Sequence, residues 1–209
     1  MMMKMKNQMR YWCFCLLCCV VLPLAAQPDA KAILDRTAAA FRAAGGVKAE
    51  FTIRTQDGST AGTLRLKGDK FLLETGGITT WFDGRTQWSY LPSTDEVNIS
   101  EPTPEELRDI NPYTLLYIYK QGYTWQMGTS AGNYYEVVLN ATRRDEHLQR
   151  IVLRVRKDNY QPLRIEVKGS GGEHSVVTIN KYATGLNHSD ALFVFDKKKY
   201  PTAEVVDLR

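Results

Sequence analysis

The chain has 209 residues, enough for one domain with a hydrophobic core, and its charges nearly balance. The first 26 residues contain three of the 27 Lys and Arg residues and none of the 23 Asp and Glu residues, so the remainder contains 24 basic and 23 acidic residues. The resulting net charge of +1 argues against a nucleic-acid partner or an acidic substrate, because such partners select strongly basic surfaces.

Residues 1–26 have the pattern of a secretory signal peptide. Three basic residues precede an apolar run of about 14 residues, which is shorter than the roughly 20 residues that span a bilayer. Ala25 and Ala26 then provide the small residues of a cleavage site before Gln27. We therefore expect this segment to be removed and a mature single domain, residues 27–209, to be exported to the periplasm. An uncleaved membrane anchor is the alternative interpretation.

All the cysteines lie within this N-terminal segment: Cys13, Cys15, Cys18 and Cys19. The mature chain therefore offers no disulfide, thiol nucleophile or cysteine metal ligand. Lipidation at Cys18 or Cys19 is an alternative fate. Such signals require a small residue just before the cysteine, and Leu17 and Cys18 occupy those places here.

The first predicted element of the mature chain is an amphipathic helix over residues 30–43. Asp29 is suited to cap its N-terminus, and Gly45 and Gly46 end it. Its apolar face is formed by residues at i, i+3 and i+4 spacing: Ile33, Leu34, Thr37, Ala38 and Phe41.

Most of the following chain alternates between apolar and polar residues, as strands with one buried face and one wet face do. Asp-Gly, Gly-Asp and Gly-Gly pairs separate these runs and supply turns. Short strands with frequent turns indicate an antiparallel meander. The predicted strands span residues 47–54, 63–67, 71–74, 78–82, 86–91, 97–99, 123–128, 134–140, 149–156, 162–168, 176–182 and, last, 193–195.

The alternation stops in the middle of the chain. Thr103 is a capping residue, followed by Pro104 at the first helical position and Glu106 at the third, which predicts a short helix. A second predicted helix over residues 111–119 is apolar nearly all round, so it must be buried or cover something apolar. Three short helices are too few to pack tightly over a whole curved sheet. Either the sheet closes on itself, or the helices act as a lid over partly filled space.

The sequence offers no constellation for catalysis or metal binding. His147, His174 and His188 show no metal-ligand spacing, and neither a Gly-x-Ser-x-Gly sequence nor a phosphate-binding loop occurs. The Asp and Glu residues show no spacing that singles out a catalytic pair. We expect a protein that is not an enzyme and that has no catalytic residues, no metal site and no cofactor.

Aromatic residues concentrate in the middle half of the chain, where they suit either a core or an adaptable apolar pocket. Residues 82–90 read Phe-Asp-Gly-Arg-Thr-Gln-Trp-Ser-Tyr, in which a tight Asp-Gly turn is followed by Trp88 and Tyr90 on one face of a strand. This segment resembles the signature hairpin of the periplasmic outer-membrane lipoprotein carrier (LolA-like) family.

Other segments resemble the same family in the same order. Residues 62–71 match its strand, basic turn and apolar strand, and residues 111–116 match its central helices. The Phe-Val-Phe sequence at 193–195 and the tail after it are similar to the closing segment of the family. The resemblance covers nearly all of the mature chain.

This resemblance implies a mainly β fold with some α: an incomplete antiparallel β-barrel, or curved sheet, with short helices as a lid over an apolar cavity. It also implies a carrier that binds the acyl chains of lipoproteins in that cavity. Such a carrier receives its cargo from an inner-membrane lipoprotein-releasing transporter and moves it toward the outer membrane, where a receptor is a further partner. A monomer is expected.

The side chains expected to bind cargo are those of the cavity and lid: Phe71, Trp81, Trp88, Tyr90, Leu107, Ile110, Leu115, Leu116 and Ile118. Many family members carry an Arg-Pro pair after the early strand, and that Arg latches the lid. Here the matching turn, residues 67–70, reads Lys-Gly-Asp-Lys, so the latch is absent or replaced. Two other interpretations stay open: a periplasmic domain that senses lipid or lipoprotein for a membrane-bound regulator, and a carrier of another lipid such as a glycolipid or fatty acid.

Overall fold

The computed structural model describes residues 29–103, 106 and 118–209, and the predicted signal peptide and most of the predicted lid lie outside the described residues. Helix α1 (Ala30–Ala43) has the predicted bounds. The Asp29 side chain accepts hydrogen bonds from the backbone N–H groups of Lys31 and Ala32, and Gly45, with φ 68°, reverses the chain after the helix. The helix buries the predicted face together with Ala30.

In the described part of the chain, twelve strands follow α1 and form one sheet. The first eleven coincide with the predicted strands to within a few residues. The described residues also form three 3₁₀ helices between strands: η2 (Ile118–Lys120), η3 (Asp190–Phe193) and η4 (Lys197–Lys199). The strands are β1 (Gly46–Arg54), β2 (Ser59–Lys67), β3 (Lys70–Thr75), β4 (Ile78–Phe82), β5 (Gln87–Leu91), β6 (Glu96–Ser100), β7 (Tyr123–Met127), β8 (Tyr134–Ala141), β9 (Leu148–Arg156), β10 (Pro162–Gly169), β11 (His174–Ala183) and β12 (Glu204–Asp207).

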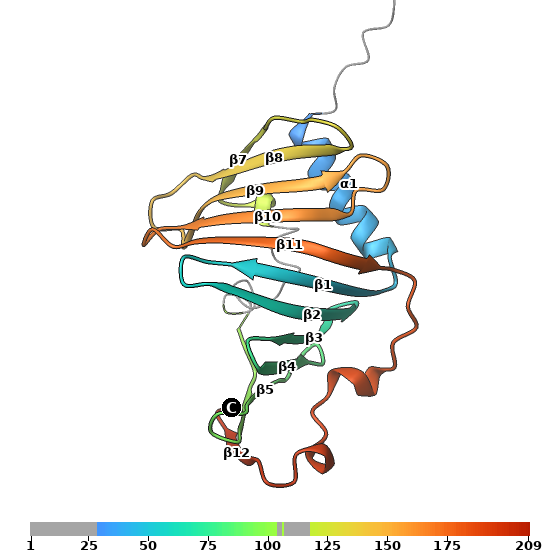
Figure 1. The fold of residues 1–209 in the computed structure, drawn as a ribbon, viewed down its shortest axis with the longest axis vertical. Coiled ribbons are helices and arrows are strands. Elements are labelled where there is room, and N and C mark those ends of the chain that lie inside the picture. The colour runs from blue at the N-terminus through green and yellow to red at the C-terminus, as the bar shows by residue number, and fades with distance from the viewer. Residues whose placement is uncertain (1–28, 104–105, 107–117) are drawn as a thin grey trace, which may run out of the picture.

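The sheet has the order β12-β6-β5-β4-β3-β2-β1-β11-β10-β9-β8-β7. Strands β1 to β6 and β7 to β11 are two antiparallel meanders, joined where β1 pairs with β11. The two outer strands, β7 and β12, are not paired with each other, so the sheet stays open (Figure 1). This curved, unclosed sheet confirms the predicted fold class, an incomplete antiparallel barrel with few helices.

Helix α1 lies across one face of the sheet, which we call the inner face (Figure 1). The N-terminal half of α1 packs with the strands β7 to β9, where Ile33 and Val137 are fully buried. Phe41, near its C-terminal end, packs with β1 to β4 around Phe71. The alternation along β1 explains the burial, because Val47, Ala49, Phe51 and Ile53 lie on the inner face while the intervening polar residues lie on the other.

The end of the predicted lid is fastened to α1. Tyr119, in η2, is buried, and its hydroxyl donates a hydrogen bond of 2.6 Å to Asp35 of α1. Residues 104–105 and 107–117, which make up most of the two predicted lid helices, lie outside the described residues.

The opposite, outer face carries a second apolar layer at β3 to β5. There the C-terminal segment, residues 184–203 between β11 and β12, covers Leu72 and Trp81 with Phe193. The prediction of a strand at 193–195 is wrong. Phe193 is the last residue of the 3₁₀ helix η3 and is fully buried. Phe193 and Phe195 therefore pack against the sheet from an irregular segment and do not belong to a strand.

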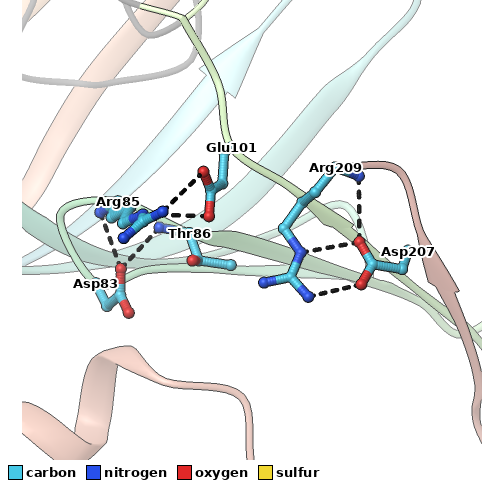
Figure 2. Close-up of polar contacts among 6 residues, drawn as sticks. All are labelled: Asp83, Arg85, Thr86, Glu101, Asp207 and Arg209. Atoms are coloured by element: carbon cyan, nitrogen blue, oxygen red, sulfur yellow. Dashed lines mark hydrogen bonds and ion pairs between the residues drawn. The ribbon is translucent and has the colours of Figure 1, made fainter.

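The last strand, β12, was not predicted. It runs parallel to β6, pairing Val205 with Val97, and so covers the edge of the N-terminal meander. Asp207, the last residue of β12, forms an ion pair of 2.6 Å with Arg209, drawn in Figure 2. Hydrogen bonds from the Arg209 side chain and backbone lower the pKa of Asp207 to about 2.

The Asp-Gly turn between β4 and β5 forms as predicted. One carboxylate oxygen of Asp83 accepts hydrogen bonds from the backbone N–H groups of Arg85 (2.9 Å) and Thr86 (2.8 Å), as Figure 2 shows. Gly84 adopts φ 102°, which other residues rarely take. The Arg85 guanidinium forms an ion pair of 3.2 Å with the carboxylate of Glu101, which follows β6. The turn sets the register in which Trp81 faces Trp88.

Candidate functional site

An apolar pocket lies on the inner face of the sheet. It has a volume of about 230 Å³ and spans the junction of the two meanders, so its walls come from seven strands and from the end of α1. The described side chains that line it are Phe41, Val47, Ala49, Phe51, Ile53, Leu64, Leu66, Leu73, Thr75, Leu139, Ile151, Leu153, Pro162, Ile165, Val177, Ile179 and Tyr182.

The side chains that line this pocket are almost entirely hydrocarbon. Among the described lining side chains, only Thr75 and Tyr182 carry a polar atom, and none carries a charge. Such a surface offers dispersion contacts and release of water, but no charged group for recognition or acid–base chemistry. The pocket can therefore hold an apolar chain.

A glycine shapes one wall of the pocket. Phe51 on β1 faces Gly62 on β2, and a Cβ atom added to Gly62 would lie 2.4 Å from the Phe51 ring. The missing side chain lets the ring lie flat against the neighbouring strand. On the other side of β1, Ala49 pairs with Tyr182 of β11, so here too a small residue lies next to a large one in the pocket wall.

The predicted cargo-binding residues fall into three groups in the structure. Phe71 is fully buried on the inner face, with its ring centroid 5.4 Å from that of Phe82, and it lies behind the pocket wall rather than in it. The wall is formed two residues further on, by Leu73. Leu107, Ile110, Leu115 and Leu116, together with the side chain of Ile118, lie outside the described residues.

The third group is the aromatic hairpin. Trp81, Trp88 and Tyr90 belong to the outer-face cluster and are not among the residues that line the pocket. The Trp81 ring lies 5.6 Å from both Phe195 and Tyr200, and the Tyr90 ring 4.5 Å from Tyr200. The C-terminal segment thus covers this group, and its part in cargo binding stays a prediction.

None of the described residues that line the pocket was predicted as a site residue. The inner-face residues of β8 to β11 were predicted as strand residues but not as site residues. Their signal is the same strict alternation that marks the first meander, as in Ile151 and Leu153 of β9 and Ile165 of β10. What the alternation does not show is that β11 pairs with β1 and brings both apolar faces to one pocket.

The basic turn between β2 and β3 is fastened to the C-terminal segment. The ammonium groups of Lys67 and Lys70 lie 3.0 and 3.1 Å from the same carboxylate oxygen of Asp190. Lys67 also donates a hydrogen bond of 2.9 Å to the backbone carbonyl of His188. This turn occupies the position of the Arg-Pro pair in the resemblance, and here its charges bind residues 188–190.

We predict that Asp190→Asn loosens this fastening in a pH-dependent way. Hydrogen bonds from Lys67, and then from Lys70, lower the pKa of Asp190 below its ordinary 3.8. A carboxylate with a lowered folded-state pKa stabilises the fold above its unfolded pKa, and that contribution is lost as the pH falls through the folded value. Wild type should therefore have the higher melting temperature at pH 7, and the difference should vanish well below pH 4.

The control is Asp69→Asn in the same turn, since Asp69 makes no ion pair within the described residues. Melting temperatures of the three proteins between pH 2.5 and 7 measure the effect. If Asp190→Asn and Asp69→Asn behave alike at every pH, the ion pairs contribute nothing measurable, as many exposed pairs do.

In the part of the chain that the structure describes, no group of three or more His, Cys, Asp or Glu residues is placed to hold a metal ion. Among the helices of residues 29–103, 106 and 118–209, none has the length and apolar character to cross a membrane.

The fold and the pocket together define a class: an incomplete β-barrel that carries an apolar ligand pocket on its inner face. The sequence model of the family described as "Outer membrane lipoprotein carrier protein LolA" matches residues 24–171. That match spans more than half of the chain, and the chain belongs to this family. The family description is that of a carrier protein, not of an enzyme. No curated protein matches the chain.

Solved structures with a similar fold include an uncharacterized conserved protein from Thermus thermophilus. It is 17% identical, with a TM-score of 0.61, over 85% of this chain and 98% of that one. A LolA superfamily protein from Nitrosomonas europaea is 16% identical, with a TM-score of 0.45, over 81% and 99% of the two chains. MucB in the MucA/MucB complex of Pseudomonas aeruginosa is 12% identical, with a TM-score of 0.46, over 81% and 62%. The first of these supports the fold assignment.

Proposed function

We propose that this protein is a periplasmic carrier that binds the acyl chains of lipoproteins in the inner-face pocket and moves them from the inner membrane toward the outer membrane. The observation that carries the proposal is a pocket at the junction of the two meanders with no charged side chain among its described walls. Family membership supports the same role.

The energetics of lipid burial favour a loose pocket over a tight one. Burial contributes about 0.8 kcal/mol per methylene, so three chains with about 12 buried methylenes each would contribute roughly 29 kcal/mol. Noncovalent complexes saturate near roughly 20 kcal/mol, and a carrier must also release its cargo. We therefore propose that the chains are only partly buried at any time.

The size of the pocket fits this view. Pockets for drug-sized ligands have volumes of about 300–1,000 Å³, and the pocket here has about 230 Å³. An acylated cargo must therefore displace something. We propose that this is the predicted lid, in which Leu107, Ile110, Leu115, Leu116 and Ile118 move aside. Contact of cargo with Trp81, Trp88 or Tyr90 would also require the C-terminal segment to move away from them.

The proposed partners follow from this role. An inner-membrane lipoprotein-releasing transporter would load the acylated lipoproteins, an outer-membrane receptor would accept them, and the carrier would work as a monomer. It would use no cofactor, because loading energy comes from the transporter. The removal of residues 1–26 during export belongs to the same proposal.

The test is to purify the protein from its own periplasm, extract the bound molecules and identify them by mass spectrometry. We expect di- or triacylated peptides in amounts comparable to the protein. A Val177→Asp variant, which places a charge in the pocket, serves as the control for lipid carried along nonspecifically. Recovery of a glycolipid, fatty acid or phospholipid in place of acylated peptide would refute lipoprotein carriage and favour the alternative lipid carrier.

A further inference from the structure

A second recess of about 210 Å³ borders the apolar pocket. This recess lies between the C-terminal half of α1 and the turn from β9 to β10, and it shares Phe41, Pro162 and Tyr182 with the pocket. Its other described lining residues are alanines or neutral polar residues, among them Gln161 and Thr184. The hydrocarbon lining of the pocket and the neutral polar lining of the recess therefore meet at these three shared residues.

Tyr182 lines both the pocket and the recess, so it stands at the boundary between the two spaces. Of the two polar side chains in the apolar pocket, Thr75 donates a hydrogen bond to the Ala61 carbonyl at 3.5 Å. The Tyr182 hydroxyl makes no hydrogen bond to any residue that the structure describes. Burial raises the pKa of Tyr182 to about 12, so the group is a neutral donor throughout the physiological range.

The wall of the recess opposite α1 is held in a strained conformation. Tyr160, in the turn from β9 to β10, has φ 58°, a left-handed value that is unfavourable for a bulky residue. Three contacts hold it there. Arg36 of α1 donates a hydrogen bond of 2.7 Å to its hydroxyl, the Arg36 guanidinium lies 5.6 Å from its ring, and its ring stacks with Tyr135 at 6.2 Å. These contacts hold Tyr160 against α1 and β8 at the wall of the recess.

We propose that the polar end of the cargo leaves the apolar pocket through this recess, where the Tyr182 hydroxyl donates a hydrogen bond to an ester carbonyl of an acyl chain. This inference rests on the proposed carrier function and names the exit and the recognised group. An acyl ester has its carbonyl at the junction of chain and head, as Tyr182 lies at the junction of pocket and recess.

The recess also selects the kind of head group. Its described lining side chains carry no charge, which suits the ester and amide groups of an acylated peptide. A phosphate would be better served by a lysine or arginine in the lining, because charged hydrogen bonds are about twice as strong as neutral ones. The recess therefore fits a diacylglyceryl peptide better than a phospholipid.

The experiment measures two lipopeptides against two proteins. The lipopeptides share one N-acetylated peptide and differ only in the diglyceride, which is ester-linked in one and ether-linked in the other. Tyr182→Phe keeps the ring and removes the hydroxyl. A neutral hydrogen bond contributes only modestly to binding. We therefore expect Tyr182→Phe to lower the affinity for the ester lipopeptide by about fivefold and to leave the affinity for the ether lipopeptide unchanged.

The control is Tyr134→Phe on the outer face, where the Arg154 guanidinium lies 5.0 Å from the ring. Equal losses for the ester and ether lipopeptides in Tyr182→Phe, or no loss for either, would overturn the assignment of the hydroxyl while leaving the carrier function intact. If the wild-type protein binds neither lipopeptide, that result refutes both the proposed carrier function and this inference.

The exit itself is tested by photo-crosslinking. A benzophenone amino acid placed next to the acylated cysteine should attach to residues 159–161 or to Thr184, mapped by mass spectrometry of the wild-type complex. The other end of the pocket lies at Ile53 and Thr75. Crosslinks confined to that end, for instance in residues 55–59, would show that the head group leaves on the opposite side and would overturn the proposed exit.

Discussion

Val177→Asp is expected to lower the affinity for an acylated peptide by on the order of 100-fold while leaving the protein folded. Val177 lies in β11, lines the pocket and is only partly buried, so a carboxylate there can remain hydrated in the empty protein. When cargo fills the pocket, the charge loses water without gaining a partner, at a cost of about 3 kcal/mol. Titration calorimetry with a diacylated peptide measures the affinity, and thermal melting reports the fold.

The matched control is Thr178→Asp. Thr178 is the next residue of the same strand, and it lies exposed on the outer face opposite Arg164. Both variants add one negative charge to β11, so they differ only in the face that receives it. An equal, small effect of the two variants would mean that cargo does not occupy the inner-face pocket.

Gly46→Ala has the largest expected effect on stability, a loss of about 3 kcal/mol in the free energy of unfolding. Gly46 is buried at the start of β1, where the chain after β11 crosses it. The Leu186 N–H donates a hydrogen bond of 3.0 Å to the Gly46 carbonyl. A Cβ atom on Gly46 would lie 2.0 Å from the Leu186 carbonyl oxygen, and backbone atoms cannot move away as a flexible side chain can.

Gly171→Ala is the control, because the three atoms nearest to its added Cβ belong to the side chain of Glu173, which is exposed and can turn away at the cost of one exposed hydrogen bond. Urea unfolding of wild type and both variants measures the difference. The expected order is a loss of less than about 1 kcal/mol for Gly171→Ala and a much larger one for Gly46→Ala. If the two losses are the same, the contact with Leu186 is too loose to constrain the junction of α1 and β1.

The sequence by itself determined the elements that depend on local pattern. The apolar stripe of α1 and its Asp29 cap set the bounds of that helix, and the alternation from Val47 onward identified the first eleven strands. The Asp83-Gly84 turn set the register of β4 and β5. A helix period, a strand period and a turn conformation are properties of neighbouring residues, so they can be recognised without knowing the rest of the fold.

Only the tertiary structure decided which strands meet and which face a side chain takes. The pairing of β1 with β11 and the parallel pairing of β12 with β6 join residues more than a hundred positions apart, for which no local period exists. The strands β3 to β5 are covered on both faces, by Phe71 and Phe82 on one and by Leu72 and Trp81 on the other. Where both faces are apolar, alternation no longer tells inside from outside. This is why the aromatic hairpin was expected at the pocket, whereas the structure places it under the C-terminal segment.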